Sequence, residues 1–415
     1  METGPSRSDT SNDPTNIKPQ FIKVKDEFLD LAKKRKSLFL ANVKILTVLS
    51  LKAIVLTGGF ATRLRPLTLT KPKSLLPILG KPLLDWILEG LAKAGLKEVI
   101  LSVRYLADMI KRRYGDGSSV GCFIKYAEEV KPLGDAGPIP LIDKDIGLDS
   151  TFIVVYGDIF SNINYRDLIY YHKKNGGLAT LVLTRVDNPY RYGVAVVDDE
   201  NKIVDFIEKP SKNQAKSNLV NAGIYVFEPE VLKYFPDKAP SKLAKDVIPK
   251  LVKDGVIYGY VHNGLWSDIG VPADYLRANF EALLHYYPEG YVSKTADING
   301  AEVVKPVYVG DDVIVDSESV IGPFTIINHG CKIGRFTKIS KSILLGNVIV
   351  EGSSLIMKSI IGERCYIGKW VRVSEDSVIG DEVVVRDCVY IARNVVILPY
   401  KELTSSVMKE GDVVL

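Results

Sequence analysis

An aliphatic residue returns at every sixth position through most of the last third of the chain, and this period constrains the fold more than any other feature. The first run is Val309, Val315, Ile321, Ile327, Ile333, Ile339 and Leu345. The second run is Ile361, Ile367, Val373, Ile379, Val385, Ile391 and Ile397. Val350 and Ile356 lie between the two runs, and the interval on either side of them is five residues instead of six. Neither an α-helix nor a hairpin repeats every six residues. The hexads predict a parallel β-helix with three hexads per coil and the aliphatic side chains inside.

The preceding part of the chain has a different hydrophobic pattern. From Lys52 to about Tyr287, short apolar runs such as 98–103 and 151–156 alternate with helical patterns. This alternation predicts an α/β fold, a Rossmann-like domain with a mostly parallel mixed sheet. Residues 192–197 and 202–208 read as a hairpin added to that sheet. We expect the first domain to span 51–287 and the β-helix 288–415.

Residues 1–50 are expected to be a disordered or dispensable extension, because the first residues are polar and of low hydrophobicity. A basic cluster at 33–36 followed by an apolar run imitates a signal peptide, but Lys44 interrupts the run and no small-residue cleavage site follows. The run is also too short and too charged to span a membrane. We therefore expect a chain that begins near Leu49 to fold and to act.

Charge and cysteine content exclude some classes of function. The formal net charge of +4 is small and scattered, which does not favour nucleic-acid binding. The cysteines show no metal-binding spacing and are read as reduced thiols of a cytoplasmic protein; they are Cys122, Cys331, Cys365 and Cys388. Scarce glutamine with abundant Lys, Ile, Val and Tyr is typical of thermophiles.

The stretch LTGGFATRLRPLTLTKPKSLLPILGKP, residues 56–82, directly follows the first predicted strand. Ligands of such sheets bind beyond the carboxyl ends of the strands. Gly58 and Gly59 would let the backbone approach phosphate oxygens closely, and Arg63 and Lys73 could add charge-assisted hydrogen bonds. The whole string therefore indicates a polyphosphate site rather than a simple turn.

This string resembles the signature of the sugar-1-phosphate nucleotidylyltransferases, GGxGTRLxPLT…PK, with Ala61 at a position where the family often has glycine. We expect Ala61 to be tolerated. Further motifs match in order: PLGDAG at 132–137 with Asp135 in place of threonine, YGD at 156–158, YGV at 192–194, EKP at 208–210, NAG at 221–223 and WSDIG at 266–270. The resemblance covers about residues 52–400 and implies that the β-helix is left-handed.

The resemblance implies that a sugar 1-phosphate attacks a nucleoside triphosphate, with Mg²⁺ as cofactor and pyrophosphate as the second product. The implied catalytic residues are Arg63, Lys73, Asp158 and Asp268, of which the two aspartates are the metal ligands. The implied nucleotide-binding residues are Leu56, Thr57, Gly58, Gly59, Glu128, Glu129, Pro132 and Gly134. The implied sugar-phosphate-binding residues are Gly193, Glu208, Lys209, Asn221 and Gly223. A phosphomonoester is already ionised near neutral pH, so the reaction needs no catalytic base.

The sequence leaves open which base and which sugar the two substrates carry. Guanine offers two neighbouring donors that a carboxylate can accept, so Glu128 and Glu129 beside the PLGDAG turn look most like a mannose-1-phosphate guanylyltransferase. One alternative is a glucose-1-phosphate thymidylyl-, uridylyl- or adenylyltransferase, with an acyltransferase in the β-helix for which His329 would be the base. Another is a non-catalytic regulatory subunit of the translation-initiation exchange-factor type. The flat faces of a β-helix favour a homo-oligomer.

Overall fold

The computed structural model describes residue 1 and residues 51–415. The predicted extension, including the run that imitates a signal peptide, lies outside the described residues. Among the described residues, no helix is both long enough and apolar enough to cross a membrane.

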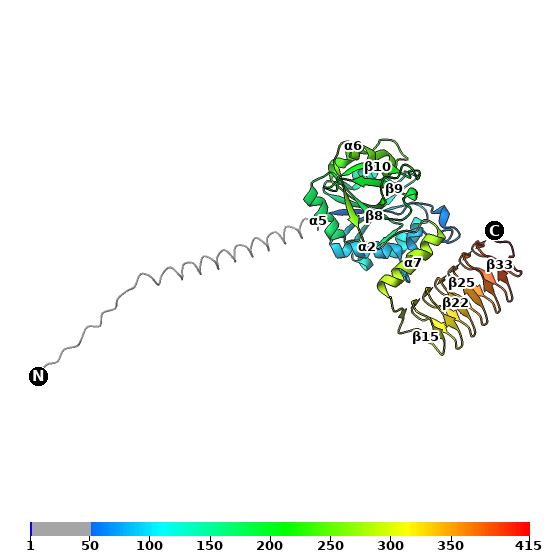
Figure 1. Cartoon of the computed structure of the whole chain (residues 1–415). Helices are drawn as coiled ribbons and strands as arrows, with labels where there is room; N and C mark the ends of the chain where they lie inside the picture. Colours follow the sequence, from blue (N-terminus) through cyan, green and yellow to red (C-terminus); the bar gives the residue numbers. More distant parts are fainter. Residues whose placement is uncertain (2–50) are drawn as a thin grey trace. The chain divides into compact units, whose positions relative to one another are not determined.

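A mixed nine-stranded sheet forms the centre of the first domain (Figure 1). Its strands are β1 (Lys52–Leu56), β4 (Glu98–Val103), β5 (Phe123–Glu128), β6 (Phe152–Tyr156), β8 (Ala179–Arg185), β9 (Gly193–Val197), β10 (Ile203–Glu208), β11 (Leu219–Phe227) and β12 (Ile257–His262). Strand β1 lies between β4 and β6 and runs parallel to both. The β9–β10 pair is antiparallel, so the predicted hairpin is confirmed. Two small ladders, β2 (Pro77–Ile78) with β3 (Lys81–Pro82) and β7 (Ile159–Ser161) with β13 (Trp266–Asp268), lie outside this sheet.

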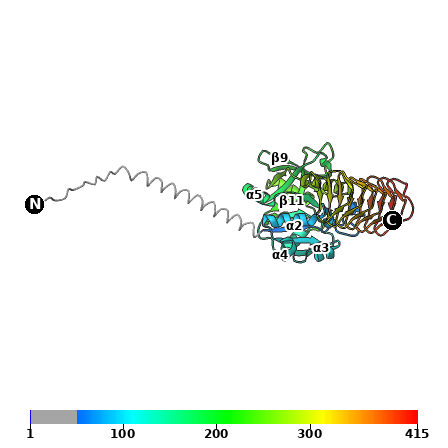
Figure 2. The same cartoon turned by 90° about the horizontal axis from the view of Figure 1, so that it is seen from below.

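Helices cover both faces of the sheet, which confirms the predicted α/β class. They are α2 (Leu83–Ala94), α3 (Ala107–Tyr114), α4 (Pro138–Ile146), α5 (Tyr165–Asn175), α6 (Ile248–Lys253) and α7 (Pro272–Tyr286). Alternate strand residues point to opposite faces. Ile54 and Val154 therefore share one core cluster with Ile139 of α4 and Leu251 of α6. Helices α2 and α5 pack on each other (Figure 2).

Three parallel sheets form the second domain, which confirms the predicted β-helix. The first sheet contains β14 (Tyr291–Val292), β17 (Val307–Val309), β20 (Thr325–Ile327), β23 (Ile343–Leu344), β26 (Ile360–Ile361), β29 (Val378–Ile379), β32 (Val396–Ile397) and β34 (Val413–Val414). The second contains β15 (Asp297–Ile298), β18 (Ile314–Val315), β21 (Lys332–Ile333), β24 (Ile349–Val350), β27 (Tyr366–Ile367), β30 (Val384–Val385) and β33 (Glu402–Leu403). The third contains β16 (Glu302–Val303), β19 (Val320–Ile321), β22 (Lys338–Ser340), β25 (Leu355–Met357), β28 (Arg372–Val373) and β31 (Tyr390–Ile391).

The predicted interior positions form one buried cluster along the β-helix, with one exception. At the predicted position Leu345, the interior residue is Leu344, which pairs with Ile327 below it and Ile361 above it. The interval of five residues instead of six therefore lies between Ile339 and Leu344. The sequence pattern had placed it one interval later, between Leu345 and Val350. Leu345 is buried as well, so hydrophobicity alone did not separate the two leucines.

The first domain covers one face of the β-helix. The outward side chains of the first sheet are buried although they do not belong to the interior cluster; they include Ile326, Ile343 and Ile360. The Phe280 ring of α7 lies 5.6 Å from the Phe324 ring. A Cβ atom on Gly80, in the β2–β3 turn, would lie 2.8 Å from the Tyr308 hydroxyl. The two domains therefore share an apolar contact.

Candidate active site

The segment after β1, residues 57–76, is named here the signature loop. It leaves the carboxyl end of β1 beside the end of β6, where the Gly157 amide donates to the Leu56 carbonyl at 2.9 Å. Gly58 packs so closely that a Cβ atom there would lie 2.6 Å from Oε1 of Glu129. The close approach explains why the chain needs glycine at this point of the loop.

Ala61 has a φ of 48° and a ψ of 44°, in the left-handed region. Glycine adopts that region readily, and alanine does so only at a cost in free energy. This conformation gives a physical reason for the glycine that the family often has here. The loop has this conformation with Ala61 in place, and the tolerance of alanine at this position stays a prediction.

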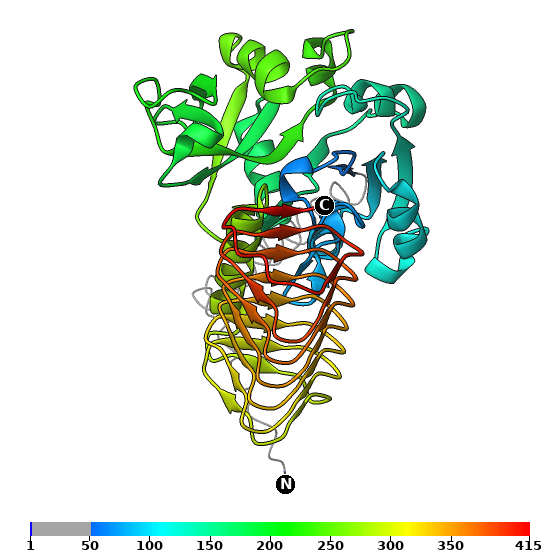
Figure 3. The same cartoon turned by 90° about the vertical axis from the view of Figure 1, so that its right-hand side faces the viewer.

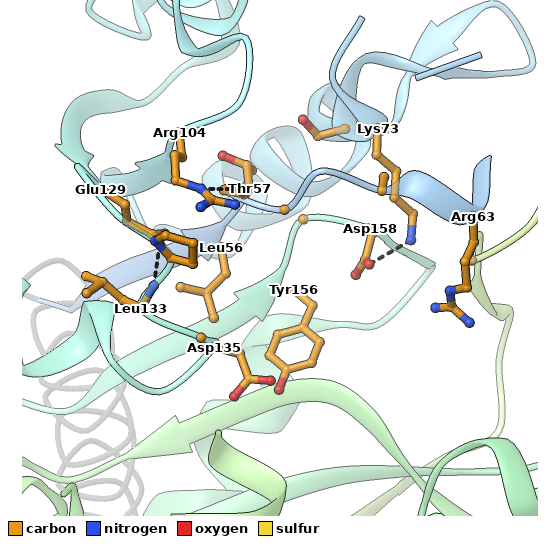
Figure 4. Close-up of a pocket in the computed structure, with 18 residues that line it drawn as sticks. Leu56, Thr57, Arg63, Lys73, Arg104, Glu129, Leu133, Asp135, Tyr156 and Asp158 are labelled. Carbon is orange, nitrogen blue, oxygen red and sulfur yellow. Dashed lines mark hydrogen bonds and ion pairs between the residues drawn. The ribbon is translucent and has the colours of Figure 1, made fainter. Parts of the chain in front are cut away.

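A cavity of about 370 Å³ opens beyond the carboxyl ends of these strands (Figure 4). Seven of the eight residues predicted to bind the nucleotide line it: Leu56, Thr57, Gly58, Gly59, Glu129, Pro132 and Gly134. Arg63, Lys73 and Asp158 lie at its other end. Gly134 (φ +80°) has no room for a side chain, because a Cβ atom there would lie 2.0 Å from the Ser241 carbonyl oxygen.

Glu128 is the eighth residue, and the structure does not bring it to the cavity. Its carboxylate is 57% exposed and pairs with Lys111 Nζ at 2.6 Å. Glu129 is buried and accepts a hydrogen bond from the Ser102 hydroxyl at 2.7 Å. Neighbouring residues of an extended chain point to opposite sides, so only one of the two glutamates can face the cavity. Of the two glutamates, Glu129 alone lines the cavity, so a contact with the base stays a prediction for Glu129 and is withdrawn for Glu128.

Asp158 and Asp268 meet through the small β7–β13 ladder. Asp268 pairs with Ile159, the neighbour of Asp158, so the register places the two carboxylates together. Lys73 Nζ lies 2.7 Å from Asp158 Oδ2 and 3.5 Å from Asp268 Oδ1. Burial and, after it, the charge of Asp158 raise the pKa of Asp268, while Lys73 and Arg63 oppose that shift.

The carboxylate pair fits Mg²⁺ in its donor chemistry. Both groups offer hard oxygen ligands, and their present partner is itself a cation, Lys73. Within residues 51–415, no group of three or more His, Cys, Asp or Glu side chains is arranged to hold a metal by itself. Such a two-carboxylate site suits a metal that takes its remaining oxygen ligands from phosphates and water.

A second cavity of about 510 Å³ adjoins the first. All the residues predicted to bind the sugar phosphate line it: Gly193, Glu208, Lys209, Asn221 and Gly223. Burial raises the pKa of Glu208. Four residues line both cavities, namely Arg63, Asp135, Tyr156 and Asp158. Two ligands that fill the cavities would therefore meet beside Arg63 and Asp158.

Sequence reasoning did not assign several residues that line the cavities. They are Arg104, Asp135, Tyr156, Arg191, Lys242 and Trp266. Arg104 directly follows β4, and this position at a strand end was a usable signal. Arg191 is held by a two-pronged ion pair with Asp274, with Nη1–Oδ1 and Nη2–Oδ2 distances of 3.1 and 2.5 Å. Since Asp274 lies 83 positions away in the chain, that pairing had no local signal.

Asp135 occupies the wall that the cavities share. Its Oδ1 accepts a hydrogen bond from the Leu243 amide at 2.6 Å, and its pKa is raised by burial. The Tyr156 ring points towards it (Figure 4). Tyr156 in turn accepts a hydrogen bond from Tyr225 at 3.2 Å. The aspartate that replaces the family's threonine is therefore part of a buried polar network between the two cavities.

Comparisons with known proteins agree with this geometry. Residues 52–284 match the nucleotidyl transferase family model, and residues 303–413 match the model described as GMPPB C-terminal domain. A "Putative mannose-1-phosphate guanyltransferase" of Sulfolobus acidocaldarius is 42% identical over 88% of this chain and 99% of that protein. The mannose-1-phosphate guanylyltransferase catalytic subunit beta of Dictyostelium discoideum is 34% identical over 86% of this chain and 98% of that protein.

Among solved structures, a "Putative Glucose-1-Phosphate Thymidylyltransferase" from Bacillus anthracis aligns with a TM-score of 0.52 and 26% identity, over 58% of this chain and 98% of that one. The sequence matches cover both domains, so the resemblance seen in the motifs is confirmed. The chain therefore belongs to the nucleotidyl transferase family, as a sugar-1-phosphate nucleotidylyltransferase of the mannose-1-phosphate guanylyltransferase type.

Proposed function

We propose that this enzyme joins mannose 1-phosphate to GTP and forms GDP-mannose and pyrophosphate. The names of the relatives that match along nearly their whole length support this pair of substrates. The observation that carries the proposal is the meeting of the two cavities at Arg63 and Asp158. One cavity has the size and glycine-lined wall for a nucleotide, and the other has a cation, Lys209, and hydrogen-bonding side chains for a sugar phosphate.

In the proposed reaction, an ionised phosphate oxygen of the sugar attacks the α-phosphorus of the triphosphate. A bond forms between that oxygen and the α-phosphorus, and the bond from the α-phosphorus to the α–β bridging oxygen breaks. Pyrophosphate leaves with the electron pair of that bond. No group of the chain needs to remove a proton, so catalysis consists of positioning and charge neutralisation.

The roles of the side chains follow from their places. Arg63, at the junction of the cavities, would stabilise the attacked α-phosphate and the leaving pyrophosphate, with Lys73 beside it. Lys209 would hold the sugar phosphate, and Glu208 would accept hydrogen bonds from sugar hydroxyls. Asp158 and Asp268 would hold Mg²⁺, which supplies further charge neutralisation on the phosphates.

Glu129 is the proposed reader of the base. Its side chain is buried at the wall of the nucleotide cavity, on the side away from Arg63 and Lys73 (Figure 4). Guanine presents N1–H and N2–H₂ as adjacent donors, and a carboxylate can accept from both. Uracil and thymine present a single ring N–H between two carbonyls, so they match an acidic acceptor less well.

A grid of substrates tests the proposal. The purified protein is incubated with Mg²⁺, each of four nucleoside triphosphates, and the 1-phosphates of mannose, glucose and N-acetylglucosamine, and pyrophosphate release is measured. The proposal expects strong release with GTP and mannose 1-phosphate. Strong release only with another pair would replace the proposed substrates, and no release by folded protein with any pair would overturn the proposed activity.

Assembly, location and domain limits belong to the proposal too. We propose a homo-oligomer that associates through the β-helix, a cytoplasmic enzyme from a thermophile, and domains that span 51–287 and 288–415. The cysteine spacing and the regular faces of the β-helix support these statements. Light scattering of the purified protein, with and without substitutions on the β-helix faces, tests the assembly.

A further inference from the structure

Two acidic residues of the β-helix reach the signature loop of the first domain. Glu363 and Asp381 occupy equivalent places on successive coils, because each follows an interior residue of a paired strand, Ile361 and Ile379. Lys71 Nζ lies 2.7 Å from Glu363 Oε1 and 3.0 Å from Asp381 Oδ2. Figure 3 shows the terminal coils of the β-helix beside the early part of the chain that contains this loop.

This contact is buried. The side chains of Lys71 and Asp381 are 7% and 1% exposed, and that of Glu363, at the edge of the contact, is 28% exposed. Asp381 Oδ2 also accepts a hydrogen bond from the Thr70 hydroxyl at 2.6 Å, and its Oδ1 accepts one from the Glu363 amide at 2.8 Å. Charges this far from water interact strongly and are costly to leave unpaired. Lys71 therefore has one well-defined position in the folded protein.

The hexad repeat of the β-helix does not by itself require acidic residues at positions 363 and 381. The strand pairing places His329 and Gly346 at the equivalent positions of the two preceding coils, and neither carries a carboxylate. Asp311 carries a carboxylate at the same position of an earlier coil, but it bonds to Ser293 of the β-helix. The acidic residues at 363 and 381 instead pair with Lys71. The pairing is thus specific to this place in the β-helix.

Lys71 is connected rigidly to the active site. Only Pro72 separates it from Lys73, and proline fixes its own φ angle, which is −61° here. Lys73 begins the short helix η3 (Lys73–Leu75), and its Nζ points to Asp158 and Asp268. A displacement of Lys71 would therefore displace Lys73 by a similar distance.

We propose that Glu363 and Asp381 position the catalytic loop by clamping Lys71 and Thr70, so that the β-helix is a structural part of the active site. Lys71 is a positioning residue in this proposal, which rests on the proposed nucleotidyl transfer. A small displacement of a catalytic group costs about 10²-fold in rate. Whatever binds or moves the two coils that carry the acidic pair would change the reaction through the same contact.

The test uses Lys71→Met, Glu363→Gln and the double variant that combines these two substitutions. Each is compared with the control variant Asp376→Asn. Asp376 is a matched control, because it lies on the same domain and pairs with Lys358 at 2.9 Å while 42% of its side chain is exposed. Two measurements are made: hydrogen–deuterium exchange of peptides from 57–76, and kcat and KM for both substrates. Thermal unfolding of each variant reports whether the fold is intact.

The proposal expects Lys71→Met to exchange faster in the signature loop and to lower kcat by about 10²-fold, with KM for the sugar phosphate unchanged. Glu363→Gln should shift both readouts in the same direction, and the double variant should be no worse than Lys71→Met, because both substitutions break one contact. Asp376→Asn should match the wild type. Normal loop exchange and kcat in Lys71→Met, or strictly multiplicative losses in the double variant, would overturn the proposal.

Two safeguards separate the possible failures. If Lys71→Met does not fold, two milder variants carry the same expectation for kcat and exchange. Glu363→Gln leaves the ion pair of Lys71 with Asp381, and Thr70→Val leaves both ion pairs and removes only the hydroxyl bond to Asp381. If the wild type transfers no nucleotide with any substrate pair, the proposed function has failed, and loop exchange alone then decides whether the acidic pair holds the loop.

Discussion

Lys73 Nζ and Asp158 Oδ2 lie 2.7 Å apart, although the two residues are 85 positions apart in the chain. Asp268 approaches the same nitrogen at 3.5 Å. An ammonium group thus balances the two carboxylates that we propose as magnesium ligands. If Asp158 and Asp268 held Mg²⁺, Lys73 would no longer be needed to balance their charge, and its ammonium group could instead neutralise charge on the phosphates.

Replacing either carboxylate should therefore stop turnover. Asp158→Asn and Asp268→Asn keep the side-chain size and remove the charge that a hard cation requires, so we expect a loss of about 10³-fold or more in kcat. Pyrophosphate release is measured across a Mg²⁺ titration, and chelation of the metal should abolish the wild-type activity. Asp205→Asn, a partly exposed carboxylate that pairs with Lys216 away from both cavities, is the control. Full activity of either variant would remove that residue from the metal site.

Glu129→Gln should weaken the preference for guanine. The amide still accepts one hydrogen bond but turns a donor towards the second guanine donor, and a hydrogen bond to a charged group contributes about 1.5–3 kcal/mol. We expect kcat/KM for GTP to fall about 10-fold or more, with a smaller change for other triphosphates. Glu128→Gln is the matched control, since Glu128 faces Lys111 instead of the cavity. Equal effects of the two substitutions would contradict this assignment.

Ala61→Gly should stabilise the protein slightly. Alanine at φ 48° is in the left-handed region, which costs about 1–2 kcal/mol, and part of that cost returns as the greater chain entropy of glycine. We expect the free energy of unfolding to rise by about 0.5–1 kcal/mol in denaturant titrations. Ala92→Gly, in the last turn of α2, should instead lower it, by up to about 1 kcal/mol. The same sign for both substitutions would show that the conformation of Ala61 has no such cost.

Ile367→Ala should destabilise the β-helix strongly. Ile367 is fully buried and pairs with Val350 and Val385 in the column of interior side chains. Removing such a side chain leaves a cavity and costs about 2–5 kcal/mol. Ile349→Ala, on the outer side of β24 with 38% of the residue exposed, should cost less than about 1 kcal/mol. Chemical unfolding followed by circular dichroism measures both, and comparable losses would contradict the inward and outward assignment.

Lowering the pH should reduce the free energy of unfolding, and His172 should contribute to this loss. The ring lies 3.1 Å from Glu228, which by distance suggests an ion pair, but burial lowers the pKa of His172 and keeps it neutral. The unfolded chain takes up a proton below about pH 6.5 that the folded chain resists, so stability falls as pH drops through that range. The free energy of unfolding of His172→Gln, measured at pH 7 and pH 5, should fall less than that of the wild type. Burial also lowers the pKa of His262, so some of the slope will remain. An unchanged slope would show that folding does not lower the pKa of His172.

Local patterns carried most of the fold. The hexads specified the β-helix because every interior position must be aliphatic, and the strand at 98–103 was read to the residue because its side chains are buried on both faces. The choice between Leu344 and Leu345 failed because both are apolar and buried, so only the pairing with Ile327 decides the register. Only the structure separates the glutamates at 128 and 129, because a charge pattern does not state which side of the chain faces a cavity.

The sequence alone determined the family, the two-domain plan and the residue types of the site, because those depend on periodicity and on short motifs that each lie within a few neighbouring residues. The tertiary structure decided which distant side chains meet. It placed Asp158 beside Asp268 through the β7–β13 register, and it placed Lys71 between Glu363 and Asp381. Both contacts join segments far apart in the chain. The first forms only when the first domain folds, and the second only when the β-helix packs against that domain.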